Sequence, residues 1–349
     1  MSSLRVVVAV PLAAELVQRC RGERPDVTWL WEPSLLPRRR HVADFAGAPG
    51  FSRTAEGQAA FEGLVDSADI LFGIPDTDPA ALRRTALANP RLAWVHTMAA
   101  GGGAQVRAAG LPEERLARLV VTTSAGVHGD GLAEFAMLGL LAGFKDVPRW
   151  DADRRARHWP DRRPVRHLRG AVVLVLGAGG IGARVARLAA SFGAQVWGLA
   201  RRGHEASPPF SRLVPPAGLA EALRGVDAVV AALPGTDATR HLVDEAFLGA
   251  LRPGAVLVNV GRGSVVDEAA LVAALASGQV GFAALDVFEV EPLPPASPLW
   301  TSDRVLLSPH TAALDAGEEE RITELFLDNL RRWCDGEPLR NQMDRTEFY

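Results

Sequence analysis

Three polar side chains with complementary chemistry follow apolar runs in the second half of the sequence: Arg262, Glu291 and His310. The runs, which predict buried strands, are Ala255–Val260, Phe282–Leu285 and Val305–Leu307. In a parallel sheet such positions lie at the carboxyl ends of the strands, where open α/β sheets bind ligands. A permanent cation, a carboxylate and an imidazole beside a nucleotide crevice are the groups needed to move a hydride to or from a hydroxy acid.

A glycine-rich segment upstream predicts the nucleotide site. The segment Gly177-Ala-Gly179-Gly-Ile-Gly182 follows a continuous apolar run and opens a helical pattern, which is the context that a dinucleotide fingerprint requires. Gly177 permits a tight turn, Gly179 lets the backbone approach a pyrophosphate, and Gly182 allows close packing of helix on strand. The helix amino terminus offers N–H groups and partial positive charge to the phosphates.

The residues after the next predicted strand bear on the choice between NAD and NADP. An NAD site usually has an acidic residue here to hold the ribose 2′-hydroxyl. This sequence has Ala200 followed by Arg201 and Arg202. Because a guanidinium binds a phosphate in a bidentate way, the pattern favours NADP, and NAD stays the alternative. The bland interpretation is that both arginines are solvated loop residues.

Apolar runs and helical patterns alternate along the chain, which predicts parallel sheets with crossover helices. The other candidate strands are Leu4–Val10, Val27–Trp31, Ile70–Gly73, Leu92–Val95, Leu119–Thr123, Ala171–Leu176, Gln195–Leu199 and Ala228–Ala232. The segment Gly131–Phe144 is apolar on nearly every side, so it predicts a helix buried in its domain or in a subunit interface. Arg149–Arg169 reads as a polar connector.

Composition excludes several classes of protein. The 349 residues carry a formal net charge of −3, which gives no electrostatic reason to expect nucleic acid or an anionic membrane as partner. No apolar stretch approaches a membrane span, and Leu4–Val10 predicts a first strand better than a signal peptide. Cys20 and Cys334 have no metal-ligand or redox spacing, so we expect two ordinary thiols of a cytoplasmic protein and no metal site.

Six motifs in order make the sequence from Gly170 onward resemble the D-isomer-specific 2-hydroxyacid dehydrogenase family. They are Leu168-Arg-Gly170, the glycine fingerprint, Leu233-Pro234 with Thr239, Asn259-Val-Gly-Arg-Gly263, Asp286-Val-Phe-Glu-Val-Glu-Pro292 and Ser308-Pro-His310. A weaker resemblance extends upstream through Thr123-Ser-Ala-Gly-Val-His128. The tail from Asn341 is similar to that of glyoxylate/hydroxypyruvate reductase-like members.

The resemblance implies a role for each polar residue. Arg262 would bind the substrate carboxylate and polarise the adjacent carbonyl, and His310 would give that carbonyl oxygen a proton during reduction. Glu291 would orient the imidazole and favour its charged form, and Asp286 would contact the nicotinamide carboxamide. The residues that we expect to contact the cofactor are Gly177, Gly179, Gly180, Ile181, Gly182, Arg201, Arg202, Leu233, Pro234, Thr239, Val260, Gly261 and Asp286.

The resemblance also implies the architecture: a Rossmann cofactor domain inserted into a flavodoxin-like substrate domain, both doubly wound. The substrate domain would comprise residues 1–98 and 311–349, and the dinucleotide-binding domain residues 99–310. Ile74, Ala100 and Gly101 would lie in loops that bind the substrate, and the glycines from Gly101 to Gly103 would loosen their loop. The Gly131–Phe144 helix would pack against its symmetry mate in a homodimer.

Three functions fit these features. The first is NAD(P)H-dependent reduction of a small 2-oxo acid, of the glyoxylate or hydroxypyruvate type, to the D-2-hydroxy acid. The second keeps the same residues but acts on a bulkier 2-keto acid or on phosphite. The third is a dinucleotide-sensing scaffold of the corepressor type, which the presence of Arg262, Glu291 and His310 does not exclude. The side chain of the substrate and the physiological direction are not predictable from the sequence.

Overall fold

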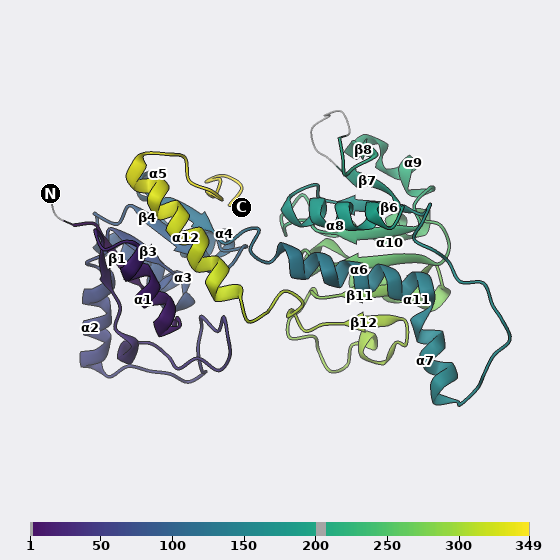
Figure 1. Cartoon of the computed structure of the whole chain (residues 1–349), viewed down its shortest axis with the longest axis horizontal. Helices are drawn as coiled ribbons and strands as arrows, with labels where there is room; N and C mark the ends of the chain where they lie inside the picture. Colours follow the sequence, from purple (N-terminus) through teal and green to yellow (C-terminus); the bar gives the residue numbers. More distant parts are fainter. Residues whose placement is uncertain (1–2, 200–206, 349) are drawn as a thin grey trace. The chain divides into compact units, whose positions relative to one another are not determined.

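The computed structural model describes residues 3–199 and 207–348, which form two compact units (Figure 1). The first unit comprises Met1–Val127 and Leu314–Tyr349, and the second comprises His128–Ala313. This division corrects the expected boundary after residue 98. Residues 99–127 belong to the first unit because strand β5 (Val120–Thr123) pairs with β4 (Trp94–Thr97) at the edge of the first sheet.

The first unit has a five-stranded parallel sheet in the order β2-β1-β3-β4-β5, which is the flavodoxin-like order. Its remaining strands are β1 (Arg5–Val8), β2 (Thr28–Leu30) and β3 (Ile70–Phe72). Its helices are α1 (Ala14–Glu23), α2 (Ala55–Val65), α3 (Pro79–Ala88), α4 (Gly103–Ala109), α5 (Glu113–Arg118) and α12 (Glu318–Asp335). Apolar residues of α1 and α12 cover one face of the sheet, and those of α2, α3 and α4 cover the other.

The second unit has a seven-stranded parallel sheet in the order β12-β11-β10-β9-β6-β7-β8. Its strands are β6 (Val172–Leu176), β7 (Gln195–Leu199), β8 (Arg212–Val214), β9 (Ala228–Ala231), β10 (Ala255–Asn259), β11 (Val280–Leu285) and β12 (Val305–Leu307). Chain order reverses between β9 and β6, and such a switch point is where doubly wound sheets bind nucleotides. The predicted α/β class with two parallel sheets is confirmed, and only the short edge strand β8 was missed among the strands described.

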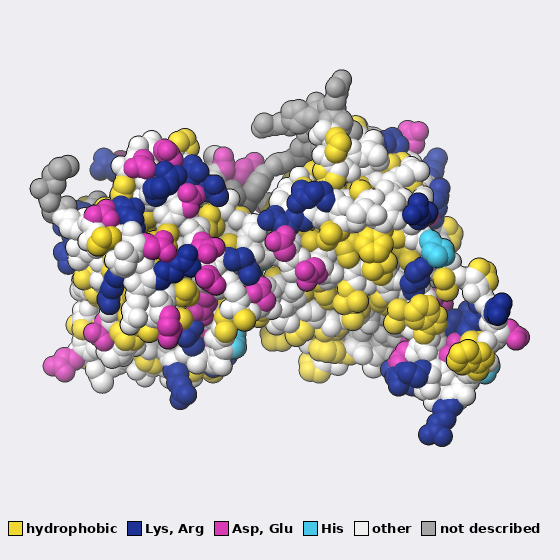
Figure 2. Space-filling model, in the orientation of Figure 1, with side chains coloured by type: hydrophobic (Ala, Val, Ile, Leu, Met, Phe, Trp, Pro, Cys, Tyr) yellow, Lys and Arg dark blue, Asp and Glu magenta, His cyan; other side chains and the backbone are white. Residues whose placement is uncertain are grey.

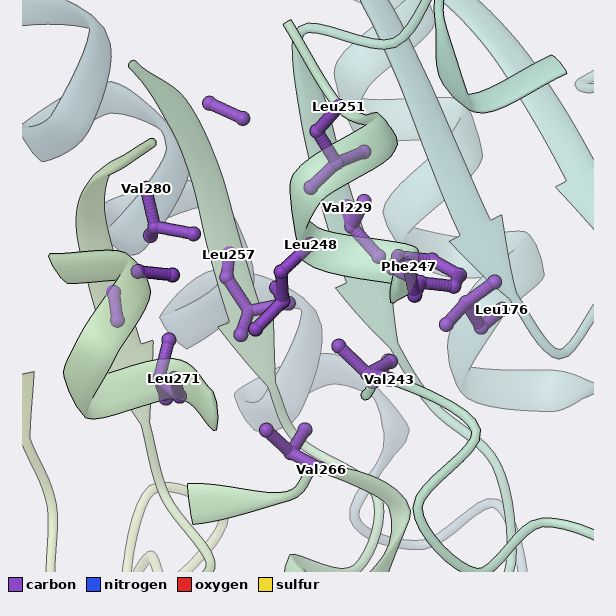
Figure 3. Packing of buried hydrophobic residues seen from close by; sticks show 14 of the residues in the cluster. Leu176, Val229, Val243, Phe247, Leu248, Leu251, Leu257, Val266, Leu271 and Val280 are labelled. Atoms are coloured by element: carbon purple, nitrogen blue, oxygen red, sulfur yellow. The ribbon is translucent and has the colours of Figure 1, made fainter. Parts of the chain in front are cut away.

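Helices cover both faces of this second sheet. The helices are α6 (Gly129–Lys145), α7 (Val147–Arg155), α8 (Gly180–Ser191), α9 (Leu219–Leu223), α10 (Glu245–Ala250) and α11 (Glu268–Ser277). Figure 3 shows the core on one face, where Phe247 and Leu248 of α10 and Leu271 of α11 pack near Leu257 and Val229 of the strands. Buried residues on both sides explain why the central strands are continuously apolar rather than alternating.

Helix α6 lies on the opposite face with α8. It approaches the strands closely, because a Cβ added at Gly139 would lie 2.4 Å from the Ala284 side chain and one at Gly143 would lie 2.6 Å from Val256. The helix is only partly buried in its own unit, since Leu138 is 54 % exposed. Helix α7 occupies the start of the segment that the sequence predicted as a connector. None of the helices in the described part of the chain has the length and apolar character to cross a membrane.

A fully buried histidine in the first unit sits in a hydrogen-bond chain that runs in one direction. The Trp94 indole N–H donates to Thr122 Oγ1 at 2.8 Å, and His96 Nδ1 lies 2.8 Å from the same oxygen. His96 Nε2 lies 3.2 Å from Ser124 Oγ, whose hydroxyl donates to the Thr97 carbonyl. Because the Ser124 proton is already used, Nε2 of His96 carries the imidazole proton and Nδ1 accepts from Thr122.

This buried imidazole predicts acid sensitivity. Desolvation lowers the pKa of His96 from 6.5 to about 3, so the unfolded chain binds a proton at a higher pH than the folded chain does. The free energy of unfolding should therefore fall as pH decreases from about 6.5 to about 3, and this group contributes up to about 1.4 kcal/mol per pH unit. Urea unfolding at several pH values should show a shallower pH dependence for His96→Gln than for the native protein. Equal slopes would contradict the prediction.

Candidate active site

Among the described residues of the second unit, the predicted site residues lie in turns and a helix start at one edge of its sheet. Because the strands are parallel, their carboxyl ends meet at the same edge. Five segments follow these ends: the glycine turn after β6, the Leu233–Thr239 loop after β9, the Gly261–Gly263 turn after β10, the Asp286–Glu291 turn after β11 and the Ser308–Thr311 turn after β12. The topology therefore gathers the glycine turn and several titratable side chains at one edge of the sheet.

His310 and Glu291 form an imidazole–carboxylate pair, as predicted. His310 Nδ1 lies 2.7 Å from Glu291 Oε2, and the other carboxylate oxygen accepts the Phe288 N–H at 2.9 Å. One carboxylate thus orients the imidazole while it is itself held by its own turn. The His310 side chain is 51 % exposed, so a second molecule can reach Nε2. This arrangement can hold a proton at Nε2 and deliver it to an oxygen.

Asp286 has a structural function that the sequence did not reveal. The residue is 2 % exposed, and its Oδ1 accepts hydrogen bonds from the Ser308 hydroxyl at 2.7 Å and from the Thr311 and Ala312 N–H groups at 3.0 Å. The His310 N–H donates to the Asp286 carbonyl. Asp286 therefore anchors the turn that carries His310. An acidic residue directly after a buried strand needs such donors, and this was the available signal.

Arg262 is presented by a turn that Asn259 braces. The buried Asn259 amide accepts the Gly261 N–H and donates to the Arg262 carbonyl, both at 3.1 Å. The Arg262 side chain is exposed, and its Nη1 donates to the Gly261 carbonyl at 2.7 Å. The next residue, Gly263, touches the Phe288 backbone, since an added Cβ would lie 1.8 Å from the Phe288 carbonyl oxygen. The Arg262 turn therefore packs directly on the turn that carries Glu291.

The glycine turn has the close contacts expected of a dinucleotide fingerprint. Gly177 has a φ of +102°, and a Cβ at Gly182 would lie 1.9 Å from the Gly177 carbonyl oxygen. Gly179 is the N-cap of α8, and a Cβ there would meet nothing within 4 Å. Gly180 and Ile181 begin the helix. The first and last glycines therefore serve packing, whereas the space beside Gly179, before the helix, is open.

The loop after β9 completes this edge. The Thr239 hydroxyl donates to the Pro234 carbonyl at 2.6 Å and accepts the Thr236 N–H at 2.9 Å, which closes the loop. A Cβ at Gly261 would lie 2.6 Å from the Leu233 carbonyl oxygen, so the two turns touch. Val260, at the end of β10, is 2 % exposed. The predicted cofactor residues Arg201 and Arg202 lie outside the residues that the structure describes.

Two alanine substitutions should separate the two functions of the glycines. In Gly182→Ala the new methyl group overlaps the Gly177 backbone, so the thermal midpoint should fall by several degrees, for about 2 kcal/mol of overpacking. In Gly179→Ala the apo protein should unfold within about 2 °C of the native midpoint, because nothing surrounds the new Cβ. The dissociation constant for NADPH should nevertheless rise at least about tenfold. Calorimetry and fluorescence titration measure both, and normal NADPH affinity in Gly179→Ala would contradict the assignment.

The residues predicted to bind substrate from loops belong to the first unit. Ile74 is 2 % exposed and follows β3, whereas Ala100 and Gly101 are half-buried before α4. The glycines after them do not loosen the loop as expected. A Cβ at Gly102 would lie 2.0 Å from Thr97 Oγ1, and one at Gly103 would lie 1.9 Å from the Phe348 carbonyl oxygen. Close packing therefore explains these two glycines.

Residues 3–199 and 207–348 contain no group of three or more His, Cys, Asp or Glu side chains arranged to hold a metal ion. Cys20 is buried and Cys334 is exposed, and both are free thiols.

Comparisons with known proteins agree with this geometry. The family described as "D-isomer specific 2-hydroxyacid dehydrogenase, NAD binding domain" matches residues 137–312. A glyoxylate reductase of Aeropyrum pernix is 36 % identical over 236 residues, which cover 65 % of this chain and 70 % of that protein. An (S)-sulfolactate dehydrogenase of Chromohalobacter salexigens is 33 % identical over 224 residues, which cover 61 % of this chain and 70 % of that protein.

Solved structures extend the similarity to the whole chain. A D-isomer specific 2-hydroxyacid dehydrogenase from Xanthobacter autotrophicus Py2, in complex with NADPH and MES, has a TM-score of 0.78 and 31 % identity and covers 100 % of both chains. The predicted family, two-sheet fold and nicotinamide-dependent oxidoreductase activity are thereby confirmed. The chain belongs to the D-isomer-specific 2-hydroxyacid dehydrogenase family.

Proposed function

We propose that this protein reduces a small 2-oxo acid of the glyoxylate or hydroxypyruvate type to the D-2-hydroxy acid with NADPH. The observation that carries the proposal is the pairing of His310 with Glu291 at 2.7 Å, on the sheet edge that also presents Arg262 and the glycine turn. The similarity to a glyoxylate reductase supports a small substrate, and the similarity to an NADPH complex supports the cofactor. These relatives favour an enzyme over a corepressor-like scaffold.

Each site residue has a proposed role in this reaction. The exposed Arg262 guanidinium binds the substrate carboxylate and polarises the adjacent carbonyl. His310 delivers a proton from Nε2 to the carbonyl oxygen, and Glu291 stabilises the imidazolium through Nδ1. The nicotinamide cofactor supplies the hydride when it is bound. Ile74, Ala100 and Gly101 are proposed as further substrate contacts on the basis of the family resemblance.

The cofactor fits the glycine turn for a physical reason. The space at Gly179 and the N–H groups at the start of α8 suit a pyrophosphate. The Thr239 loop and the Val260–Gly261 turn border the same edge, and Asp286 stays the proposed partner of the nicotinamide carboxamide. The preference for NADP over NAD rests on the sequence Ala200-Arg-Arg202, which lacks the acidic residue of an NAD site.

One panel tests both substrate class and cofactor. The purified protein is assayed with NADPH and with NADH against glyoxylate, hydroxypyruvate, pyruvate and phenylpyruvate, and with NADP⁺ against phosphite. We expect the highest kcat/KM for glyoxylate or hydroxypyruvate with NADPH. Arg201→Asp should reverse the cofactor preference by roughly 10-fold or more, because a carboxylate repels the 2′-phosphate. Turnover of none of these compounds would overturn the proposed function, and a higher kcat/KM with NADH would overturn the cofactor assignment.

A homodimer through α6 and α7 is part of the proposal. Large apolar side chains stay exposed there and on the adjacent α8: Leu138, Val147, Trp150, Leu188 and Phe192. Figure 2 shows hydrophobic side chains gathered over this part of the second unit. Apolar patches of this kind commonly mark subunit interfaces. Light scattering should give twice the mass of the 37.2 kDa chain, and Trp150→Glu should lower the measured mass.

The two free thiols accord with a cytoplasmic location, which stays a prediction.

A further inference from the structure

Another histidine–carboxylate pair involves the turn that carries Glu291. His241 Nε2 is hydrogen-bonded to Glu289 Oε1, and His241 Nδ1 lies 3.9 Å from Asp267 Oδ2. The side chains of His241 and Glu289 are 34 % and 23 % exposed. The proposed reaction uses neither residue. Glu289 is nevertheless only two positions before Glu291 in the chain.

The backbone of His241 is tied to the turn that carries Arg262. The His241 N–H donates to the Ser264 carbonyl at 2.8 Å, and the Val243 N–H donates to the Val265 carbonyl at 3.0 Å. A parallel bridge joins Val243 to Val266. The backbone of His241 thus makes the first of a short series of hydrogen bonds to the segment that follows Arg262. Its imidazole contacts the segment that carries Glu291.

Glu268 strengthens the same connection from the first turn of α11. Its Oε1 accepts the Glu289 N–H at 2.5 Å, and its own N–H donates to Glu289 Oε2 at 3.2 Å. Burial raises the pKa of Glu268, opposed by the Glu289 N–H hydrogen bond, and the carboxylates of Glu289 and Glu291 raise it further. Glu268, Glu289 and Glu291 therefore lie close enough to interact electrostatically. The titratable side chains that meet here are Asp267, Glu268, Glu289, Glu291 and His241.

The contact between the two turns leaves little freedom. Because Gly263 has no side chain, its backbone can touch the Phe288–Glu289 peptide. A Cβ added at Gly263 would lie 2.6 Å from the Glu289 nitrogen. Both carboxylate oxygens of Glu289 are hydrogen-bonded: Oε1 to His241 Nε2, and Oε2 to the Glu268 N–H. We propose that His241 and Glu289 are positioning residues that hold the Arg262 turn against the Glu291 turn. The inference deepens the proposed function and rests on it for the roles of Arg262 and Glu291.

The physical consequence is a fixed offset between the carboxylate-binding cation and the proton donor. Because a displacement of about 1 Å between reacting groups can cost about 100-fold in rate, holding two turns in register matters for both binding and chemistry. Loss of the pair should therefore raise KM for the 2-oxo acid and lower kcat together. NADPH affinity should stay unchanged, since the glycine turn is held by contacts of its own.

The test uses His241→Gly, Glu289→Gln and the double variant in the full chain. Glycine suits position 241 because His241 has a φ of +48°, a conformation that favours glycine, so the substitution removes the imidazole without backbone strain. We expect kcat/KM to fall roughly 10- to 100-fold in each single variant, with both kcat and KM affected. The double variant should be no worse than the worse single variant, because both remove the same pair. If the losses in kcat/KM of the two single variants add up in the double variant, the positioning role is overturned. It is also overturned if only kcat changes and does so in proportion to the fraction of folded protein.

His158→Gly is the matched control. His158 also pairs with a carboxylate, with Nδ1 3.1 Å from Asp153 Oδ1, but it lies beyond the end of α7. Its kcat and KM should equal those of the native enzyme. A loss in this control equal to that of His241→Gly would assign the effect to general destabilisation and would overturn the proposal.

Hydrogen–deuterium exchange gives a readout that does not need turnover. The Phe288 and Glu289 N–H groups are held by the Glu291 and Glu268 carboxylates. In His241→Gly these amides should exchange about five-fold faster, as expected for the loss of one supporting hydrogen bond. Unchanged exchange overturns the positioning role whatever the native protein reduces. If the native protein reduces none of the 2-oxo acids but these amides still exchange faster in His241→Gly, the positioning role is supported and the proposed function fails.

Discussion

Asparagine in place of His310 should lower kcat by about 1000-fold while NADPH still binds with nearly native affinity. The removed imidazole is the only proposed proton donor to the carbonyl oxygen, and a positioned acid contributes about 100- to 10,000-fold. Asparagine is the suitable replacement because His310 has a φ of +56°, a left-handed conformation that asparagine tolerates better than alanine. Steady-state assays with the preferred 2-oxo acid measure kcat, and fluorescence titration measures NADPH binding.

Glu291→Gln provides the companion to this experiment. Glutamine keeps the size of the side chain, but its single acceptor oxygen cannot serve both the Phe288 N–H and the Nδ1–H of a charged His310. It also lacks the negative charge that stabilises the imidazolium. The loss in kcat of Glu291→Gln should be smaller than that of the His310 variant, roughly 10- to 100-fold.

If the His310 variant keeps more than about a tenth of the native activity, the imidazole does not have the proton-transfer role.

Arg262→Gln should lower kcat/KM by about 100- to 1000-fold, mainly through a higher KM for the 2-oxo acid. Removing one partner of a hydrogen-bonded guanidinium–carboxylate pair costs about 3 to 4 kcal/mol. The turn itself should survive, because Asn259 holds it through the Gly261 N–H and the Arg262 carbonyl and not through the guanidinium. Initial-rate measurements over a wide range of substrate concentration separate KM from kcat.

Arg252→Gln is the control for this change. Arg252 precedes the amino end of the same strand, β10, and its guanidinium pairs with Asp227 at 2.9 Å. Its loss removes one arginine of equal charge from the opposite edge of the sheet, so kcat and KM should stay native. Equal effects of the two substitutions would point to the net charge of the protein instead of to a carboxylate contact.

The sequence predicted the architecture because the relevant signals are local. Continuous apolar runs such as Ala255–Asn259 are long enough to identify buried strands, and the glycine spacing at residues 177 to 182 identifies a strand–turn–helix. The domain boundary was misplaced because residues 99–127 contain helices and a strand that fit either sheet. Only the pairing of β5 with β4 assigns them to the first unit.

The predicted strands placed His310 and Glu291 at one edge of a parallel sheet, and the family resemblance implied that they pair, as they do in the structure. For Asp286, its place directly after a buried strand indicates a need for hydrogen-bond donors but not which donors, because its partners are the hydroxyl and amide groups of a turn 22 to 26 residues away. The His241–Glu289 contact, which joins residues 48 positions apart, has no sequence pattern of its own. Such contacts arise only when the strands have set their turns side by side. Short-range periodicity in the chain therefore specifies which elements form and which chemistry they can present, whereas the packing of one turn on another decides how that chemistry is held.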